Sequence, residues 1–255
     1  MMSLRIVLIL MVLMLLGVGC TKQVTQQGPV TEVAAEGHTL RHTVAKGETL
    51  RRIADNYFGD PDLAGAIAAM NGITDPDRIV PGSVLVLEFD ESQWQGARKR
   101  SVALDAYNKG VDLMAQDRLA EAEKQFRLAL DTSPDLESAS YNLALVLAQR
   151  GKNAEALVIL DKLTASSPEN TDFHFARGHS LFLVARFSEA ATEFQKVLSL
   201  EGEHKRAVFG MARSLQEDGQ KQKAMKAWDQ YLELDSTSSW ADVARRNLKK
   251  LRDGS

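Results

Sequence analysis

The side chains best suited to metal or nucleophilic chemistry in this sequence are five histidines and a single cysteine. His38 and His42 flank the first predicted strand, while His174 and His179 share a predicted helix, five residues apart. A zinc-binding helix instead carries two histidines four residues apart, with a glutamate between them. One cysteine can form neither an internal disulfide nor a thiolate cluster. We therefore expect no metal site and no cofactor.

The carboxylates and the overall charge also argue against catalysis and against nucleic-acid binding. Glu121 and Glu123 point to different faces of a predicted helix. The sequence contains no glycine-rich phosphate loop and no nucleophile elbow. The net charge is −3, whereas nucleic-acid binders usually carry a basic excess. A basic cluster within 245–252 is expected to be a solvated helix face. The sequence predicts a binding protein, not an enzyme.

The single cysteine, Cys20, lies close behind an N-terminal apolar segment. An apolar run over 6–16 precedes it; at about 1.5 Å per helical residue the run spans roughly 17 Å, too short for a hydrocarbon core of about 30 Å. The run therefore predicts a secretory signal over 1–19. Gly19-Cys20 resembles the end of the lipobox of bacterial lipoproteins, although Gly17 replaces the usual leucine. The resemblance implies that Cys20 carries the lipid; an uncleaved anchor or an incidental cysteine are the alternatives.

A polar, unpatterned stretch over 20–37 follows and predicts a flexible tether. It would reach about 60 Å when fully extended. Thr21 stands where an aspartate would imply retention at the inner membrane. By the same resemblance we expect a lipid-anchored protein of the outer membrane, facing the periplasm.

Residues 38–89 have the pattern of a small βααβ module. Leu40, His42 and Val44 alternate as in a strand, and Thr49 can cap a helix that Gly59 ends. Asp60-Pro61 begins a second helix, Asn71-Gly72 ends it, and Pro81-Gly82 leads into a strand over 84–87. A charged linker over 90–102 follows.

The motifs from His42-Thr43-Val44 through Gly47-Glu48-Thr49-Leu50 and Asn71-Gly72-Ile73 to Pro81-Gly82 resemble a LysM domain over about 42–88. LysM domains bind glycans that contain N-acetylglucosamine, so the resemblance implies peptidoglycan as ligand. It implies a shallow groove between the first strand-helix loop and the loop before the last strand, and the residues mapped to its walls are Gly47, Glu48, Thr49, Leu50, Asn71, Gly72 and Ile73. The sequence departs from the usual LysM pattern at two positions: Arg51 replaces a frequent aromatic residue, and His42 replaces a common tyrosine. These departures imply that this single module binds a glycan weakly.

The remaining chain repeats with a period of 34 residues, seen in Ala122, Ala156, Ala190 and Ala224. A large apolar residue recurs at the same interval, at Phe126, Leu160, Phe194 and Trp228. This pattern resembles tetratricopeptide repeats, with four repeats over 103–238 and a capping helix over 239–255. The predicted fold is an α+β LysM module followed by an all-α tetratricopeptide-repeat solenoid.

A second ladder with the same period indicates a possible partner groove. Its aromatic positions are Tyr107, Tyr141, Phe175 and Phe209, and one helical turn further lie Val111, Leu145, His179 and Arg213. Two interpretations stay open. The aromatics either pack between adjacent helices, or they line a groove for a peptide or a partner helix, apolar at the first two repeats and cationic toward the fourth.

Together these modules predict a non-catalytic envelope scaffold. Lipid at Cys20 would hold the membrane, the LysM module would hold peptidoglycan, and the repeats would hold an envelope protein or peptide. Two alternatives use the same modules: an assembly factor of a secretion, pilus or polysaccharide-export machine, and an accessory regulator of a cell-wall hydrolase. Repeat arrays of one fold serve many partners, so the fold does not choose between them.

Overall fold

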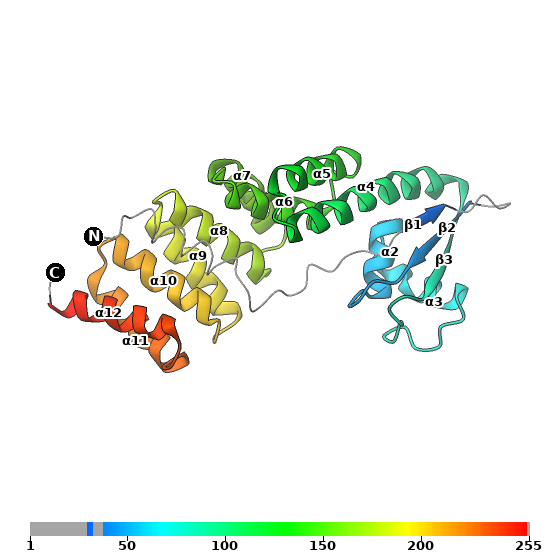
Figure 1. The fold of residues 1–255 in the computed structure, drawn as a ribbon. Helices are drawn as coiled ribbons and strands as arrows, with labels where there is room; N and C mark the ends of the chain where they lie inside the picture. Colours follow the sequence, from blue (N-terminus) through cyan, green and yellow to red (C-terminus); the bar gives the residue numbers. More distant parts are fainter. Residues whose placement is uncertain (1–29, 33–37, 254–255) are drawn as a thin grey trace. The chain divides into compact units, whose positions relative to one another are not determined.

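A computed structural model describes residues 30–32 and 38–253 (Figure 1). The signal segment and Cys20 lie outside the described residues. The chain divides within one helix into two compact units, the first ending at Val146 and the second beginning at Leu147.

The first unit begins with a three-stranded antiparallel sheet in the order β1-β2-β3. Strand β2 (His38–Thr43) pairs with β3 (Val84–Phe89), so that His38 lies opposite Phe89. Strand β1 (Val30–Glu32) pairs with the other edge of β2. The tether predicted over 20–37 therefore contains a strand, which a polar sequence without alternation does not reveal.

Two helical segments lie between β2 and β3, as the βααβ pattern predicts. Helix α2 (Leu50–Phe58) begins at the Thr49 cap and ends at Gly59, which adopts a φ of 71°. A short 3-10 turn, η1 (Pro61–Leu63), leads into α3 (Ala64–Met70). The module encloses a core whose most buried members include Leu40, Leu50, Ile53, Ile67 and Leu87.

The segment 90–102, predicted as a linker, is instead helical. It forms the first half of α4 (Glu91–Ala115), a helix that continues into the first repeat. Asp90 and Gln93 form a capping box at its start. Ala97 and Leu104, on one face of α4, are buried in the same core as the LysM-like module. The small module and the first repeat helix therefore share a hydrophobic core.

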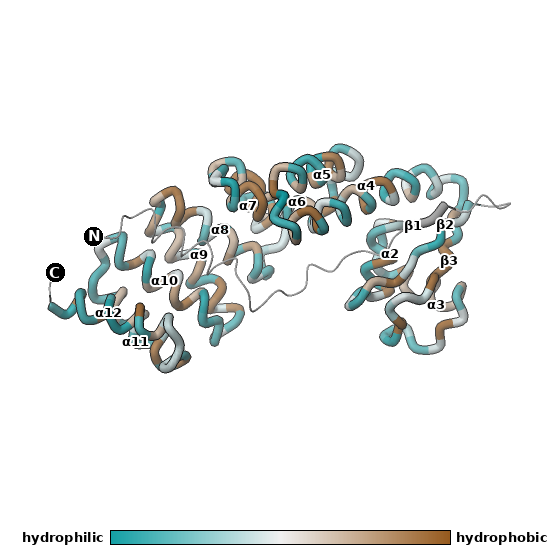
Figure 2. Tube along the Cα trace, in the orientation of Figure 1, coloured by the Kyte–Doolittle hydropathy of each residue, from teal (hydrophilic) through white to brown (hydrophobic). Residues whose placement is uncertain are grey.

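The 34-residue period corresponds to paired helices. The first unit holds α4, α5 (Leu119–Thr132) and most of α6 (Glu137–Gln149). The second holds the end of α6 and the helices α7 (Asn153–Ser166), α8 (Thr171–Leu183), α9 (Phe187–Leu200), α10 (Lys205–Glu217), α11 (Lys221–Leu234) and α12 (Ser239–Asp253). Along these helices apolar and polar residues alternate in short stretches (Figure 2).

Small residues in the repeats allow the helices to approach closely. A Cβ atom on Gly110 would lie 2.6 Å from the Phe126 ring, and one on Gly178 would lie 3.1 Å from the Phe194 ring. Phe126, Phe194 and Trp228 are fully buried. In α12, Ala241, Ala244 and Leu248 are buried, whereas the basic cluster is exposed, as predicted: Arg245, Arg246, Lys249, Lys250 and Arg252.

Candidate functional site

The loop between β2 and α2, together with the first residue of α2, contains four of the seven residues predicted to contact a glycan. Gly47 is exposed and has a φ of 79°, a conformation that favours glycine. The hydroxyl of Thr49 accepts a hydrogen bond from the Arg52 N–H at 3.3 Å, so this residue caps α2 while remaining exposed. Leu50 is 1% exposed and belongs to the core. The prediction that Leu50 covers a sugar face is wrong for this structure.

Glu48 is also buried, at 5% exposure. Its Oε2 accepts a hydrogen bond from the Ala45 N–H at 2.8 Å and lies 2.8 Å from Nε2 of His42. Nδ1 of His42 lies 3.1 Å from the Tyr57 hydroxyl. Burial raises the pKa of Tyr57 well above its usual value, and the negative charge of Glu48 adds to this. The Glu48 side chain therefore braces the loop from inside, and its carboxylate does not face a ligand.

The second predicted wall lies at the end of α3. Here too one residue holds the fold together while the others keep exposed surface. The Asn71 amide donates to the carbonyls of Ile67 and Val86, both at 2.9 Å, and its oxygen accepts from the Val86 N–H at 2.7 Å. These bonds commit the side chain to joining α3 to β3. Gly72 is exposed with a φ of 65°, and Ile73 is half-buried. A ligand can meet the backbone here and the exposed part of Ile73.

The turn at Pro81-Gly82, before β3, lies against the first loop. The Gly82 N–H donates to the Val44 carbonyl, and the Val44 N–H donates to the Ser83 carbonyl, both at 2.8 Å. Val80, just before this turn, is 67% exposed. An exposed apolar side chain beside a loop of open backbone can pack against a sugar face. The pairing of β2 with β3 places Val80 there, and no local sequence pattern marks this residue.

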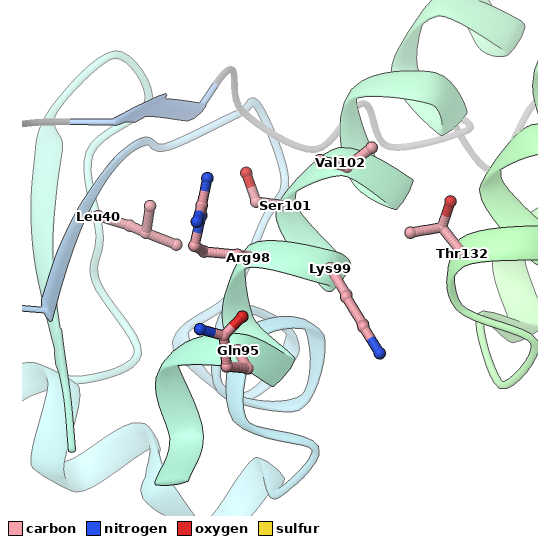
Figure 3. A pocket seen from close by; sticks show the side chains of 7 residues that line it. All are labelled: Leu40, Gln95, Arg98, Lys99, Ser101, Val102 and Thr132. Carbon is pink, nitrogen blue, oxygen red and sulfur yellow. The ribbon is translucent and has the colours of Figure 1, made fainter. Parts of the chain in front are cut away.

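The first unit also has a hollow of about 310 Å³ beside α4 (Figure 3). Its lining consists of Leu40, Gln95, Arg98, Lys99, Ser101, Val102 and Thr132. The lining is partly cationic and contains no carboxylate or histidine to serve as an acid or a base. Over the part of the chain that the structure describes, no three potential ligands gather around a metal position. Nor is any helix among the described residues long and apolar enough to span a bilayer.

In the first repeat the predicted groove aromatic is a packing residue. Tyr107 is 3% exposed and lies 5.9 Å from the Phe126 ring. Its hydroxyl accepts a hydrogen bond from the Asn142 amide at 3.1 Å, and burial raises the pKa of the phenol. Val111 is 8% exposed. Tyr141 and Leu145 of the second repeat are half-buried and keep some accessible surface.

In the second unit, too, some of the predicted groove residues are buried and others are half-buried. Phe209 is 2% exposed and its ring lies 5.0 Å from Trp228. His179 is 4% exposed, and its burial lowers its pKa to about 4. Phe175 and Arg213 are half-buried. The aromatics at 107 and 209 thus pack between helices, while the ladder remains accessible at Tyr141, Leu145, Phe175 and Arg213.

A buried polar network in the second unit was not predicted. Nδ1 of His174 lies 2.7 Å from Glu193, and its Nε2 lies 3.0 Å from the Pro168 carbonyl. Arg177 bonds to Glu193 and, at 2.6 Å, to Asp161. The network ties α7, α8 and α9 together, which explains His174 as a structural residue. No local sequence pattern predicts this network, because its residues come from three different helices.

Comparison with known protein families agrees with this geometry. The LysM domain family matches residues 42–88. Tetratricopeptide repeat families match residues 113–178 and 206–238. The fold is therefore an α+β LysM module followed by an all-α tetratricopeptide-repeat solenoid, and both matched modules are non-catalytic binding domains.

Among curated proteins, the chain is similar to DnaJ homolog subfamily C member 3 of Mus musculus, with 33% identity over 123 residues, which cover 47% of this chain and 24% of that protein. It is 27% identical to a TPR repeat-containing protein of Rhizobium etli, over 46% of this chain and 58% of that protein. An esterase of Mycobacterium tuberculosis is 45% identical over 58 residues, which are 23% of this chain and 13% of the esterase. The chain thus spans about a quarter of the mouse protein's length.

Two solved structures show the same fold. A tetratricopeptide repeat protein from Parabacteroides merdae aligns with a TM-score of 0.54 at 19% identity, covering 60% of this chain and 61% of that one. MamA from Desulfovibrio magneticus aligns with a TM-score of 0.52 at 18% identity, covering 58% of this chain and 83% of that one. At these identities the likeness concerns the fold alone.

Proposed function

We propose that this chain is a non-catalytic scaffold of the bacterial envelope, which binds peptidoglycan through the LysM module and a protein partner through the repeats. The observation that carries the proposal is the exposure of Gly47, Thr49 and Gly72, on loops braced from inside by Glu48 and Asn71. Braced, exposed loops suit a glycan ligand, because little order is lost on binding.

We further propose that Cys20 carries a lipid that holds the protein at the outer membrane, facing the periplasm. The support is the sequence alone: a short apolar run, small residues and one cysteine. Acyl chains contribute about 0.8 kcal/mol per buried CH₂, so several chains would anchor the protein stably. Labelled palmitate should enter the wild-type protein in growing cells and be absent from Cys20→Ser.

Sedimentation with purified sacculi tests the glycan link. The wild-type protein should pellet with the sacculi, and Val80→Glu should reduce the pelleted fraction, since the new charge lies beside the proposed groove. Val102→Glu is the matched control, because that valine is also exposed, at 54%, but lies on α4. If the wild-type protein stays in the supernatant, the wall-binding proposal is wrong.

A further inference from the structure

Helices α8 and α10 present two matched pairs of an arginine and a phenylalanine. The guanidinium carbon of Arg206 lies 4.9 Å from the centre of the Phe175 ring, and that of Arg213 lies 5.7 Å from the centre of the Phe182 ring. Both distances fall within the range of a cation–π contact. The two arginines are seven residues apart on α10, and so are the two phenylalanines on α8. Each pair therefore joins the same faces of the two helices, two turns apart.

Stacking on a ring restrains a guanidinium and leaves its N–H edge for hydrogen bonds. Arg213 has more N–H donors than it has hydrogen-bond acceptors around it. Its Nη2 lies 3.3 Å from Glu217, while its Nε is buried without a hydrogen-bond partner. The side chain is 13% exposed. The accessible end of this restrained and largely desolvated guanidinium can pair with a carboxylate of a ligand through a charge-assisted N–H bond.

The spacing of the pairs limits the ligand. Seven residues of α10 correspond to about 10.5 Å along the helix. In a polyproline II segment, residues three apart lie on the same side at about 9.3 Å, because the rise is about 3.1 Å per residue. The glutamate side chains of the ligand can absorb this difference of about 1 Å. A partner helix, about 10–12 Å wide with its side chains, would approach the recessed Arg213 less easily.

Resting on the proposed protein-binding function of the repeats, we infer that the α8–α10 face binds an extended acidic segment of the partner, with two carboxylates three residues apart that pair with Arg206 and Arg213. Phe175, which is half-buried, would cover the apolar part of that segment. Positive charge at these two positions and negative charge in the peptide are complementary.

Fluorescence anisotropy with the full chain and short labelled proline-rich peptides tests this inference. The peptides carry two glutamates two, three or four residues apart, with a glutamine version of each and a helical peptide whose glutamates are seven apart. The peptide with glutamates three apart should bind tightest, at least about tenfold more tightly than its glutamine version, since the glutamine version loses the charge-assisted hydrogen bonds. Equal binding of all spacings, or tighter binding of the helical peptide, would overturn the inference.

Five variants separate pairing from net charge and from folding. Arg206→Gln and Arg213→Gln should each weaken binding about tenfold or more. Lysine at either position keeps the charge but loses the forked geometry and should give an intermediate loss. The double variant Arg245→Gln/Arg246→Gln removes charge from exposed positions of α12 and should bind as the wild type does. An equal loss in this control would show a net-charge effect and overturn the inference. Thermal melts should show each variant folded.

Crosslinking in cells distinguishes this inference from the proposed function. If the Arg206→Gln/Arg213→Gln chain still captures the same protein as the wild type, the acidic-segment inference is wrong while the scaffold proposal stands. If the wild-type chain captures no protein, the proposed partner function itself fails.

Discussion

Nε2 of His42 lies 2.8 Å from a carboxylate oxygen of Glu48, and neither side chain is exposed to solvent. The sequence comparison places Glu48 on the wall of a glycan groove, but the structure uses its side chain to hold that wall in place. His42, at a position where tyrosine is common, supplies the partner. The departure at His42 and the burial of Glu48 are therefore one structural feature.

Replacing Glu48 by alanine should destabilise the LysM module by about 1–3 kcal/mol, because the Ala45 N–H and the His42 ring lose their acceptor inside the protein. Urea unfolding measures the change. Glu88→Ala is the control, since Glu88 is exposed on β3. Equal stability of the two variants would contradict the bracing role of Glu48.

Tyr57→Phe should make the stability of the protein less dependent on pH at alkaline pH. Burial raises the pKa of Tyr57 in the folded state, so its contribution is complete below about pH 10, the usual tyrosine value, and is lost as the pH rises beyond it. The wild-type melting temperature should therefore fall from pH 9 to pH 11 more steeply than that of the variant. At pH 7 the variant should lose about 0.5–1.5 kcal/mol, because the hydroxyl no longer bonds to His42. Parallel curves would contradict the prediction.

Gly110→Ala should destabilise the first repeat by about 1–3 kcal/mol through overpacking, since the new Cβ atom would lie 2.6 Å from the Phe126 ring. Gly65→Ala is the matched comparison, because Gly65 lies in α3 with open space around it. There the higher helix propensity of alanine should stabilise by up to about 1 kcal/mol. Chemical denaturation of both variants should show opposite signs.

Sequence patterns predict the fold well where a period or a cap determines local structure. The 34-residue period, the Thr49 cap and the Gly59 helix end all appear in the structure. Contacts between distant segments are harder to predict. The bonds of Asn71 to Val86 join residues fifteen apart, and nothing in the local sequence distinguishes a fold-stabilising asparagine from a ligand-binding one. The ladder of aromatics had the same ambiguity, which burial resolved at Tyr107 and Phe209.

The helical character of 90–102 could have been predicted from Asp90 and Gln93, which have capping-box spacing. It leads to a direct test: Val102→Pro should cost about 3 kcal/mol or more, because proline removes a hydrogen bond within α4 and clashes with the preceding turn. A flexible linker would tolerate proline. Val102→Ala keeps the helix and should be nearly neutral at this exposed site. Circular dichroism and thermal melts would show the difference.

His179→Leu should make the stability of the repeats less dependent on pH in mild acid. Burial lowers the pKa of His179 from 6.5 to about 4 in the folded state, so its contribution is complete above about pH 6.5 and is lost as the pH falls toward 4. The loss amounts to about 3 kcal/mol at most. Leucine already occupies the equivalent position of the second repeat, at Leu145, so the change suits the fold.

Urea unfolding at pH 7.5, 6 and 5 should show a smaller decline in the free energy of unfolding for His179→Leu than for the wild type. His174→Gln is the control, because this second histidine of α8 has partners at both ring nitrogens. If His179→Leu declines as steeply as the wild type, the titration of His179 does not cause the acid sensitivity.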